Sequence, residues 1–364
     1  MRWFLLDQLA ALSQRYDVTL IVNTDNADFI ADTGVPVRVL PVRIERKISL
    51  WRDAQALMYL VRIMWREGFA AVHSVTPKAG LLAMLAATVC CVPVRIHIFT
   101  GQVWATRIGN ARRLLKLLDT VTARLTTHLL VDSDSQRQFL IDERVTSAAK
   151  ASVLGYGSIS GVNVARFAPD AHHRQRVRSG LGLNETDVVF MYLGRLNPDK
   201  GLLDLAAAFA LSAQANWHWV IVGPDEANLM PELMRICEQV ADQVHFLGRS
   251  HAPEVEMAAA DVFCLPSYRE GFGTVLIEAA AMSIPVLASR IYGITDAVVE
   301  GETGLLHAPH VVDEIAAKMR LLAEDVDLRQ RLGEQGMQRA RRDFSQAYVT
   351  GEVVAFYARI LPVV

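Results

Sequence analysis

Two glutamates in the stretch YREGFGTVLIEA, residues 268–279, could act together on a ligand. Glu270 stands before two glycines, and Glu278 follows eight positions later in an otherwise apolar run. A buried carboxylate without partners is costly, so Glu278 needs hydrogen-bond donors. Helix capping explains it poorly, because a capping box that starts at Thr274 needs Glu or Gln where Ile277 stands. The helix dipole accounts for Glu270 as well as a binding role does, but it does not account for the pair.

The residues between the two glutamates favour binding of a phosphate. Gly271 and Gly273, on either side of Phe272, let the backbone approach a ligand closely, and Thr274 begins a predicted helix. The free N–H groups at such a helix start suit a phosphate or a diphosphate. Glu278, about one turn further on, would then lie near the ribose hydroxyls of a nucleotide, which can donate to its carboxylate.

A second candidate site follows the apolar run 188–194, in the sequence GRLNPDKG. Arg195 and Lys200 lie five residues apart across a turn that contains a proline. The planar fork of an arginine and the point charge of a lysine could together grip a diphosphate. The glycine spacing does not fit a P-loop, and no Ser or Thr follows the lysine. A surface turn with two solvated cations is the alternative interpretation.

These candidate residues lie at the ends of β-rich apolar runs that alternate with helical patterns. In an open parallel sheet, ligands bind beyond the carboxyl ends of the strands, which is where these loops fall. The alternation predicts an α/β fold with two tandem Rossmann-like, doubly wound domains. The predicted strands are 18–23, 35–42, 70–75, 94–99 and 128–133, followed by 188–194, 217–223, 244–248, 261–266 and 284–289.

A Gly/Ser-rich stretch, GYGSISGVNVARFAPD at 155–170, has no periodicity and is predicted to link the two domains. We predict a first domain over residues 1–158, a second over 159–343 and an amphipathic C-terminal helix over 344–364. The chain opens with the helical pattern WFLLDQLAALSQRY, where a doubly wound domain normally begins with a strand. Either the first domain is a variant that lacks its first strand, or Met1 is an internal methionine, and we favour the second interpretation.

Three segments, GRLNPDKG, EGFGTVLIEAAAMSIPVLAS and EGETGLL, together resemble the nucleotide-sugar half of the GT-B glycosyltransferases, specifically their retaining family 4. The resemblance extends over most of residues 160–345, and the two glutamates fit the E-x7-E motif of that family. It implies that Arg195 and Lys200 neutralise the donor diphosphate, that Glu278 binds the ribose, and that Glu270 acts beside the donor sugar.

The same resemblance has further implications for the second domain. The loop at Gly248 and Arg249 would border the base, and the two domains would face a cleft, with the C-terminal helix crossing back to the first domain. Where the family commonly reads G-G-[IL]-P-E, this chain reads YGITD at 292–296. That loop usually faces the donor sugar, so the departure puts the identity of the sugar in doubt more than the activity.

The first domain is similar to the acceptor half of relatives that build surface polysaccharides and lipid-linked glycans, through HSVTPKAGLLAMLAA and RIHIFTGQVW. Many relatives have a histidine immediately before Gly101, where this chain has Thr100, and His97 stands three residues earlier. These are acceptor-side candidates, although His97 could instead be a buried core histidine. Lys78, at a predicted helix start, opposes the helix dipole and so hints at an anionic partner.

Transfer of this kind needs no metal and no other cofactor, because cations and a helix start can stabilise charge on the leaving diphosphate. The DSDS run at 132–135 more simply ends a strand and caps a helix. Paired carboxylates also occur in glycoside hydrolases, but a ribose role for Glu278 disfavours that interpretation. The predicted function is a glycosyltransferase that uses a UDP-sugar donor and a lipid-linked or polysaccharide-precursor acceptor. A UDP-sugar epimerase of the same fold and a non-catalytic subunit are the alternatives.

Composition and charge restrict the location and partners of the protein. The four cysteines lack metal-site spacing, no apolar run reaches the roughly 18–20 residues that span a bilayer, and no signal peptide is recognisable. We therefore expect a cytoplasmic protein. Residues 1–150 hold 19 Lys/Arg against 13 Asp/Glu, and the remainder holds 18 against 26. The basic first half suits peripheral contact with an anionic membrane, and no nucleic-acid partner is expected.

The predicted surface helices of the first half interleave basic and aromatic residues, as membrane-surface helices do. The tryptophans could instead be core residues. The set comprises Arg43, Arg46, Lys47, Trp51, Arg62, Trp65, Arg66, Arg112, Arg113 and Lys116.

Overall fold

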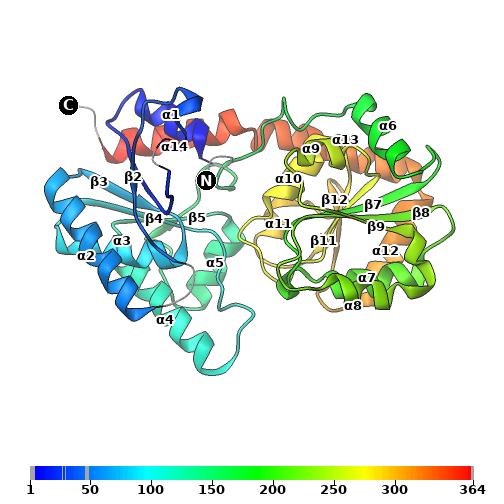
Figure 1. Ribbon diagram of the computed structural model, residues 1–364, viewed down its shortest axis with the longest axis horizontal. Helices are drawn as coiled ribbons and strands as arrows, with labels where there is room; N and C mark the ends of the chain where they lie inside the picture. Colours follow the sequence, from blue (N-terminus) through cyan, green and yellow to red (C-terminus); the bar gives the residue numbers. More distant parts are fainter. Residues whose placement is uncertain (1–4, 27, 29, 46–48, 362–364) are drawn as a thin grey trace. The chain divides into compact units, whose positions relative to one another are not determined.

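The computed structural model in Figure 1 describes residues 5–26, 28, 30–45 and 49–361. The chain forms two compact units: unit 1 comprises Met1–Ser160 with Gln346–Val364, and unit 2 comprises Gly161–Ser345. Arg46, Lys47 and the first residues of the predicted opening helix lie outside the described residues.

Unit 1 has two parallel sheets among its described residues. Four strands pair in the order β3-β4-β5-β6, and β1 pairs with β2. Helices α2, α3 and α4 lie side by side on one face of the four-stranded sheet, while α1 and α14 pack together on the other (Figure 1). The strands are β1 (Thr19–Val22), β2 (Arg38–Pro41), β3 (Ala71–Ser74), β4 (Val94–Phe99), β5 (His128–Val131) and β6 (Ala151–Ser152). The helices are α1 (Leu6–Ser13), α2 (Leu50–Glu67), α3 (Pro77–Val89), α4 (Gly109–Leu125), α5 (Asp134–Asp142) and α14 (Gln346–Ile360).

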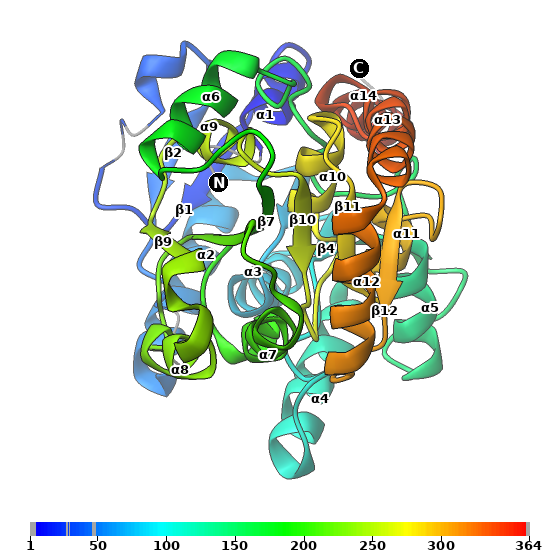
Figure 2. The ribbon, with the colours of Figure 1, turned by 90° about the vertical axis from the view of Figure 1, so that its right-hand side faces the viewer.

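Unit 2 is a doubly wound domain with one parallel six-stranded sheet in the order β12-β11-β10-β7-β8-β9. Helices α8, α7 and α12 form one layer, and α6, α9, α10 and α13 form the other, with the sheet between them (Figures 1 and 2). The strands are β7 (Val188–Leu193), β8 (Trp217–Val222), β9 (Val244–Gly248), β10 (Val262–Leu265), β11 (Val286–Ser289) and β12 (Gly304–His307). The helices are α6 (Ala171–Gly180), α7 (Leu202–Ser212), α8 (Met230–Ile236), α9 (Pro253–Met257), α10 (Thr274–Ala281), α11 (Ile294–Ala297), α12 (Val312–Glu324) and α13 (Val326–Asp343).

The central strands of unit 2 are continuous apolar runs because both faces of their sheet are covered. Phe190, Trp217 and Trp219 are almost completely buried. The Phe190 ring packs with those of Trp217 and Phe209, and Phe209, on α7, also packs with Trp219. Aromatic and β-branched side chains fit such a buried pleated surface, which is why these segments form strands rather than helices.

Polar side chains start several of the helices. Ser133 accepts a hydrogen bond from the Gln136 N–H at the start of α5, so the DSDS run does cap a helix as predicted. Asp170 and Asp325 cap α6 and α13 in the same way. Such caps satisfy backbone N–H groups that lack a partner within the helix.

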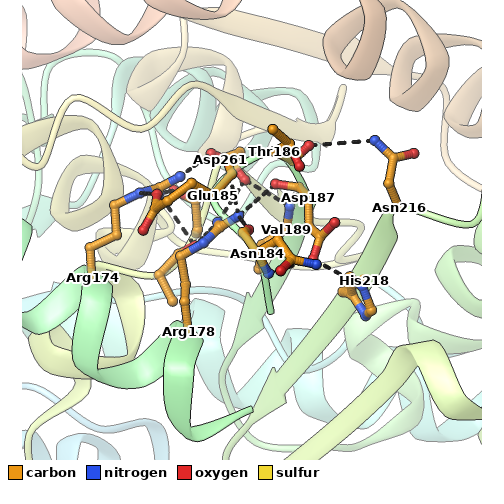
Figure 3. Close-up of polar contacts among 12 residues, drawn as sticks. Arg174, Arg178, Asn184, Glu185, Thr186, Asp187, Val189, Asn216, His218 and Asp261 are labelled. Carbon is orange, nitrogen blue, oxygen red and sulfur yellow. Dashed lines mark hydrogen bonds and ion pairs between the residues drawn. The ribbon is translucent and has the colours of Figure 1, made fainter. Parts of the chain in front are cut away.

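A buried polar network fixes the amino ends of β7 and β10 (Figure 3). The guanidinium of Arg178, on α6, is 1% exposed and donates to the carbonyls of Asn184, Asp187 and Ala259. It also lies 3.1 Å from the Asp261 carboxylate, which in turn accepts from the Val189 N–H. The carboxyl ends of the same two strands carry the candidate site residues, so the network anchors the opposite ends of the strands that lead to the site.

Within the described residues, no helix is both long and apolar enough to cross a membrane.

Candidate functional site

The loops after β7 and β10 meet at the carboxyl edge of the unit 2 sheet. These strands are neighbours at the point where the strand order reverses, which is where open α/β sheets bind ligands. The first loop runs from Gly194 to Gly201 and the second from Pro266 to Gly273. Two of the three residues predicted to be catalytic come together here.

The paired residues are Lys200 and Glu270. Lys200 Nζ lies 2.5 Å from Glu270 Oε1, and Ser267 Oγ donates to the same oxygen over 2.8 Å. Both side chains are mostly buried, with exposed fractions of 18% and 15%. Burial raises the pKa of the Tyr192 hydroxyl beside them, and the negative charge of Glu270 raises it further. A cation and a carboxylate are therefore held together at the edge of the sheet.

Contacts that the sequence analysis missed hold these two loops together. The Tyr268 N–H donates to the Asp199 carbonyl over 2.8 Å, and Arg269 forms an ion pair with the Asp199 carboxylate at 3.0 Å. Asp199 and Arg269 each stand next to a predicted site residue in the sequence. Their opposite charges were the sequence feature from which this ion pair could have been predicted. Gly201 has φ +66°, and a Cβ there would lie 2.0 Å from the Pro266 carbonyl oxygen, so only glycine permits this approach.

A third loop, after β12, reaches the same region. The His310 ring stacks on the Tyr268 ring with centroids 3.9 Å apart, and the Tyr268 hydroxyl donates to Asp204 over 2.6 Å. Asp204 lies on α7, directly behind the loop that carries Lys200. No pattern in the sequence connects these three residues, because they come from three separate elements.

Arg195 does not share the partner of Lys200. It is half exposed and forms an ion pair with Glu226, on the loop after β8, at 3.0 Å. The sequence placed both cations on one turn, and the structure gives each of them a different carboxylate.

The glycines of the second loop lie at the start of α10. Gly273 is the N-cap residue with φ +77°, and no side chain caps the helix. The Phe272 ring packs in the core of unit 2 against Phe344, so its side chain is structural. Gly293 lies so close that a Cβ would sit 2.4 Å from the Gly271 carbonyl oxygen. The YGITD loop therefore contacts the backbone beside Glu270. Thr274, the first residue of α10, is partly buried.

Glu278 lies within α10 and is partly buried. Burial raises the pKa of its carboxyl to about 8, a shift that the positive charge of Arg166 opposes and the negative charge of Glu254 reinforces. Arg166 and Glu254 form an ion pair at 2.7 Å. The sequence predicted that an ionised Glu278 would need hydrogen-bond donors. The raised pKa instead favours the protonated carboxyl near neutral pH.

Gly248 and Arg249 end β9 and begin the next loop. Gly248 has φ +68°, its carbonyl accepts from the Gly223 N–H, and the Arg249 side chain is exposed. Ser250 donates to Glu256 over 2.8 Å, which ties this loop to α9.

The acceptor-side candidates of unit 1 have different environments. His97 is fully buried: its Nδ1 lies 2.8 Å from Ser74 Oγ, its ring contacts Gly80, and burial lowers its pKa to about 3. Thr100 and Gly101 lie on the loop directly after β4, with Gly101 at φ +129°. Lys78 forms an ion pair with Asp53 at 2.5 Å, so the anion that its position called for lies on α2 of the same unit.

Two family models match this chain. Residues 173–339 match the model described as glycosyl transferases group 1, and residues 1–157 match the model described as glycosyl transferase 4-like domain. The first of these ranges contains all the unit 2 residues that the sequence predicted as site residues.

Known proteins resemble the chain over most of its length. It is 29% identical over 355 residues to the capsular polysaccharide biosynthesis glycosyltransferase CapM of Staphylococcus aureus, covering 94% of this chain and 90% of CapM. It is 29% identical over 292 residues to the UDP-Gal:alpha-D-GlcNAc-diphosphoundecaprenol alpha-1,3-galactosyltransferase of Escherichia coli, covering 77% of this chain and 73% of that protein.

A solved structure supports the predicted fold. HepE of Anabaena, crystallised in complex with UDP, matches with a TM-score of 0.80 at 19% identity, over 97% of this chain and 94% of HepE. Together with the two parallel α/β units, this match confirms the predicted GT-B architecture.

Proposed function

The chain belongs to the glycosyl transferases group 1 family, and we propose that it transfers a hexosyl or N-acetylhexosaminyl group from a UDP-sugar to a lipid-linked or polysaccharide-precursor acceptor, with retention of configuration. The observation that carries this proposal is the Lys200–Glu270 pair at the carboxyl ends of β7 and β10, beside the start of α10. The names of CapM and the E. coli galactosyltransferase support the acceptor class, and UDP in HepE supports a uridine donor.

The reaction breaks the bond between the anomeric carbon and the diphosphate oxygen. The acceptor oxygen bonds to the same carbon, and the electron pair of the broken bond stays on the diphosphate. The proton of the acceptor hydroxyl leaves with that diphosphate, so atoms and charge balance. The main demand is therefore to stabilise negative charge on the leaving group.

In this proposal, Lys200 and the uncapped start of α10 meet that charge, and no metal is required. A lysine has three N–H donors, so Lys200 can hold Glu270 and a phosphate oxygen together. Arg195, half exposed and ion-paired, can add a second cation by exchanging its partner. Glu278 accepts from the ribose hydroxyls, and Glu270 faces the donor sugar from the loop that Gly293 contacts.

The acceptor is proposed to meet unit 1 at the inner, cytoplasmic face of the plasma membrane, to which the protein binds peripherally. Thr100 and Gly101 are the acceptor-side candidates that this proposal keeps, because they lie at the carboxyl end of β4. The diphosphoundecaprenol in the name of the E. coli relative supports a membrane-held acceptor.

A transfer assay combined with thermal-shift screening of UDP-, GDP- and ADP-sugars tests the proposal, because a donor that binds the folded chain raises its apparent stability. We expect stabilisation by a UDP-sugar, UDP release that depends on the acceptor, and the same rate after chelation of divalent metal. Lys200→Ala and Glu270→Ala should abolish transfer, whereas Glu278→Ala should mainly weaken UDP binding.

The matched control is Arg235→Ala, which removes an exposed, ion-paired cation on α8. Near-normal turnover in Lys200→Ala would refute the diphosphate role. Consumption of UDP-sugar without an acceptor would instead identify an epimerase.

A further inference from the structure

Helix α2 carries large apolar side chains on its outer surface. Trp51 is 72% exposed, Met58 62% and Trp65 82%, and these three residues are seven apart, so they lie on one side of the helix. We define the α2 outer face as Trp51, Met58, Tyr59, Arg62, Trp65 and Arg66, all of which are exposed.

The opposite side of α2 already provides the packing that holds the helix in unit 1. Ala56, Leu60, Ile63 and Met64 are buried, three of them in the cluster shared with α3. The outer face is therefore not needed to attach the helix to its own unit. Isolated apolar residues are normal on surfaces, but two tryptophans and a methionine in one row form a patch of the kind that binds a partner.

Charge on the α2 outer face is positive. Arg62 and Arg66 are exposed there, and Arg52 lies at its edge. Both carboxylates of the helix are turned aside: Asp53 pairs with Lys78 at 2.5 Å, and Glu67 with Arg38 at 2.5 Å. Arg66 Nε lies 4.0 Å from the Glu67 carboxylate and Arg52 pairs with Glu45, so the positive charge of this face comes mainly from Arg62 and the largely exposed Arg66. The partner that fits has an apolar layer beneath an anionic surface.

We propose that the α2 outer face docks on the head-group layer of an anionic lipid bilayer. Trp51 and Trp65 are 14 residues apart, so the two rings are about 21 Å apart along the axis and a helix lying in the membrane plane would insert both. Tryptophan suits this layer because its ring is apolar and its N–H needs a polar partner. The arginines, whose stems are apolar and whose heads are charged, would contact lipid phosphates.

A second copy of this chain fits the face less well. In a two-fold dimer the same patch meets itself, so the face that carries Arg62 and Arg66 would meet an equally positive face. Like charges brought together in this way oppose association, whereas a layer of phosphates attracts them. The inference deepens the proposed function by naming the surface that meets the membrane, but it rests on exposure and charge and not on the transfer chemistry.

Binding to vesicles without donor or acceptor tests the inference separately from catalysis. The full chain is mixed with vesicles of phosphatidylcholine alone, or with about one third phosphatidylglycerol, which supplies the anionic surface. We expect binding to the anionic vesicles only, with a blue shift of tryptophan fluorescence and quenching by lipids brominated on their chains. Trp104, Trp217 and Trp219 are at most 2% exposed, so they do not contribute to that quenching.

Variants on the face give the expected magnitudes. Trp51→Ala and Trp65→Ala should each weaken vesicle binding by about tenfold, the lower end for burial of a large apolar side chain. Arg62→Gln and Arg66→Gln should each weaken it by about fivefold, and less at high salt. Leu211→Ala is the matched control, because Leu211 is 57% exposed on α7 in the acidic unit 2. It should bind vesicles as the parent does.

Two results would overturn the inference. The first is unchanged vesicle binding in the Trp51→Ala/Trp65→Ala double variant, with near-ultraviolet circular dichroism showing an intact fold. The second is no vesicle binding by the parent while the chain dimerises in solution and Trp51→Glu/Trp65→Glu makes it monomeric. That outcome would assign the face to a second copy. If the parent chain binds anionic vesicles but shows no sugar transfer, that result would contradict the proposed function and leave this inference standing.

Discussion

Replacing Glu278 by glutamine should change how the stability of unit 2 depends on pH. The carboxyl keeps its proton up to a pKa of about 8 in the folded chain, against an ordinary value of 4.5. Between these values the folded state binds one proton that the unfolded state has lost. Raising the pH therefore lowers the free energy of unfolding, and Glu278→Gln, which cannot ionise, removes that dependence.

The size of the effect follows from the proton difference. One bound proton changes the free energy of unfolding by up to about 1.4 kcal/mol per pH unit, which is almost 3 kcal/mol between pH 5.5 and 7.5. Glu278 is only partly buried, and solvent reduces the penalty on its ionised form, so we expect about 1–2 kcal/mol. For a unit of this size that corresponds to a difference in melting temperature of about 3–8 °C.

Urea unfolding of the parent and Glu278→Gln at pH 5.5 and 7.5, without nucleotide, measures this effect. Relative to the parent, the variant should be more stable at pH 7.5 than at pH 5.5, whatever constant offset the amide introduces. Glu334→Gln, an exposed glutamate on α13, is the control and should follow the parent at both pH values. An offset of the same size at both pH values would refute the argument that Glu278 is desolvated.

Two further substitutions test the parts that position the site. Arg178→Met should lower the free energy of unfolding by about 3–5 kcal/mol. The change leaves the buried Asn184, Asp187 and Ala259 carbonyls without this donor and Asp261 with one cation fewer. Chemical denaturation measures the loss, and a loss below about 1 kcal/mol would contradict the prediction. Gly201→Ala should reduce turnover at least about tenfold in the transfer assay, because the added methyl pushes apart the loops that hold Lys200 and Glu270. Gly182→Ala, at a similar φ of +71° with nothing within 4 Å, carries the same backbone strain without the clash and should keep its activity.

Much of the fold could be predicted from the sequence because the strands and helices have strong periodic patterns. The predicted strand 94–99 is β4 with the same ends, and the predicted strand 217–223 is β8 to within one residue. Continuous apolar runs mark strands buried on both faces, and Gly68 in the left-handed region ends α2. Short elements such as β6, with two residues, and α11, with four, lack enough length to show any period.

The environment of each side chain was harder to predict than the element that carries it. Trp51 and Trp65 fit a core stripe or an outer face equally well by spacing, and packing on α3 decided that they face outward. The position of Lys78 at a helix start predicted an anionic partner, and the structure shows that this partner is Asp53 on α2, 25 residues earlier in the same chain. Pairing across elements depends on tertiary structure, which the local sequence does not encode.

The two glutamates of YREGFGTVLIEA differ because Glu270 is ion-paired with Lys200, whereas burial dominates the environment of Glu278. Glu270 sits on a loop where its carboxylate contacts the Lys200 ammonium and accepts from the Ser267 hydroxyl. Glu278 lies on α10, where burial raises its pKa, and the charge of Arg166, which is paired with Glu254, opposes that shift. Carboxyl groups whose environments differ in this way suit different tasks. A carboxylate paired with a lysine suits the place where charge develops, whereas a carboxyl whose pKa is raised by burial suits recognition of hydroxyl groups.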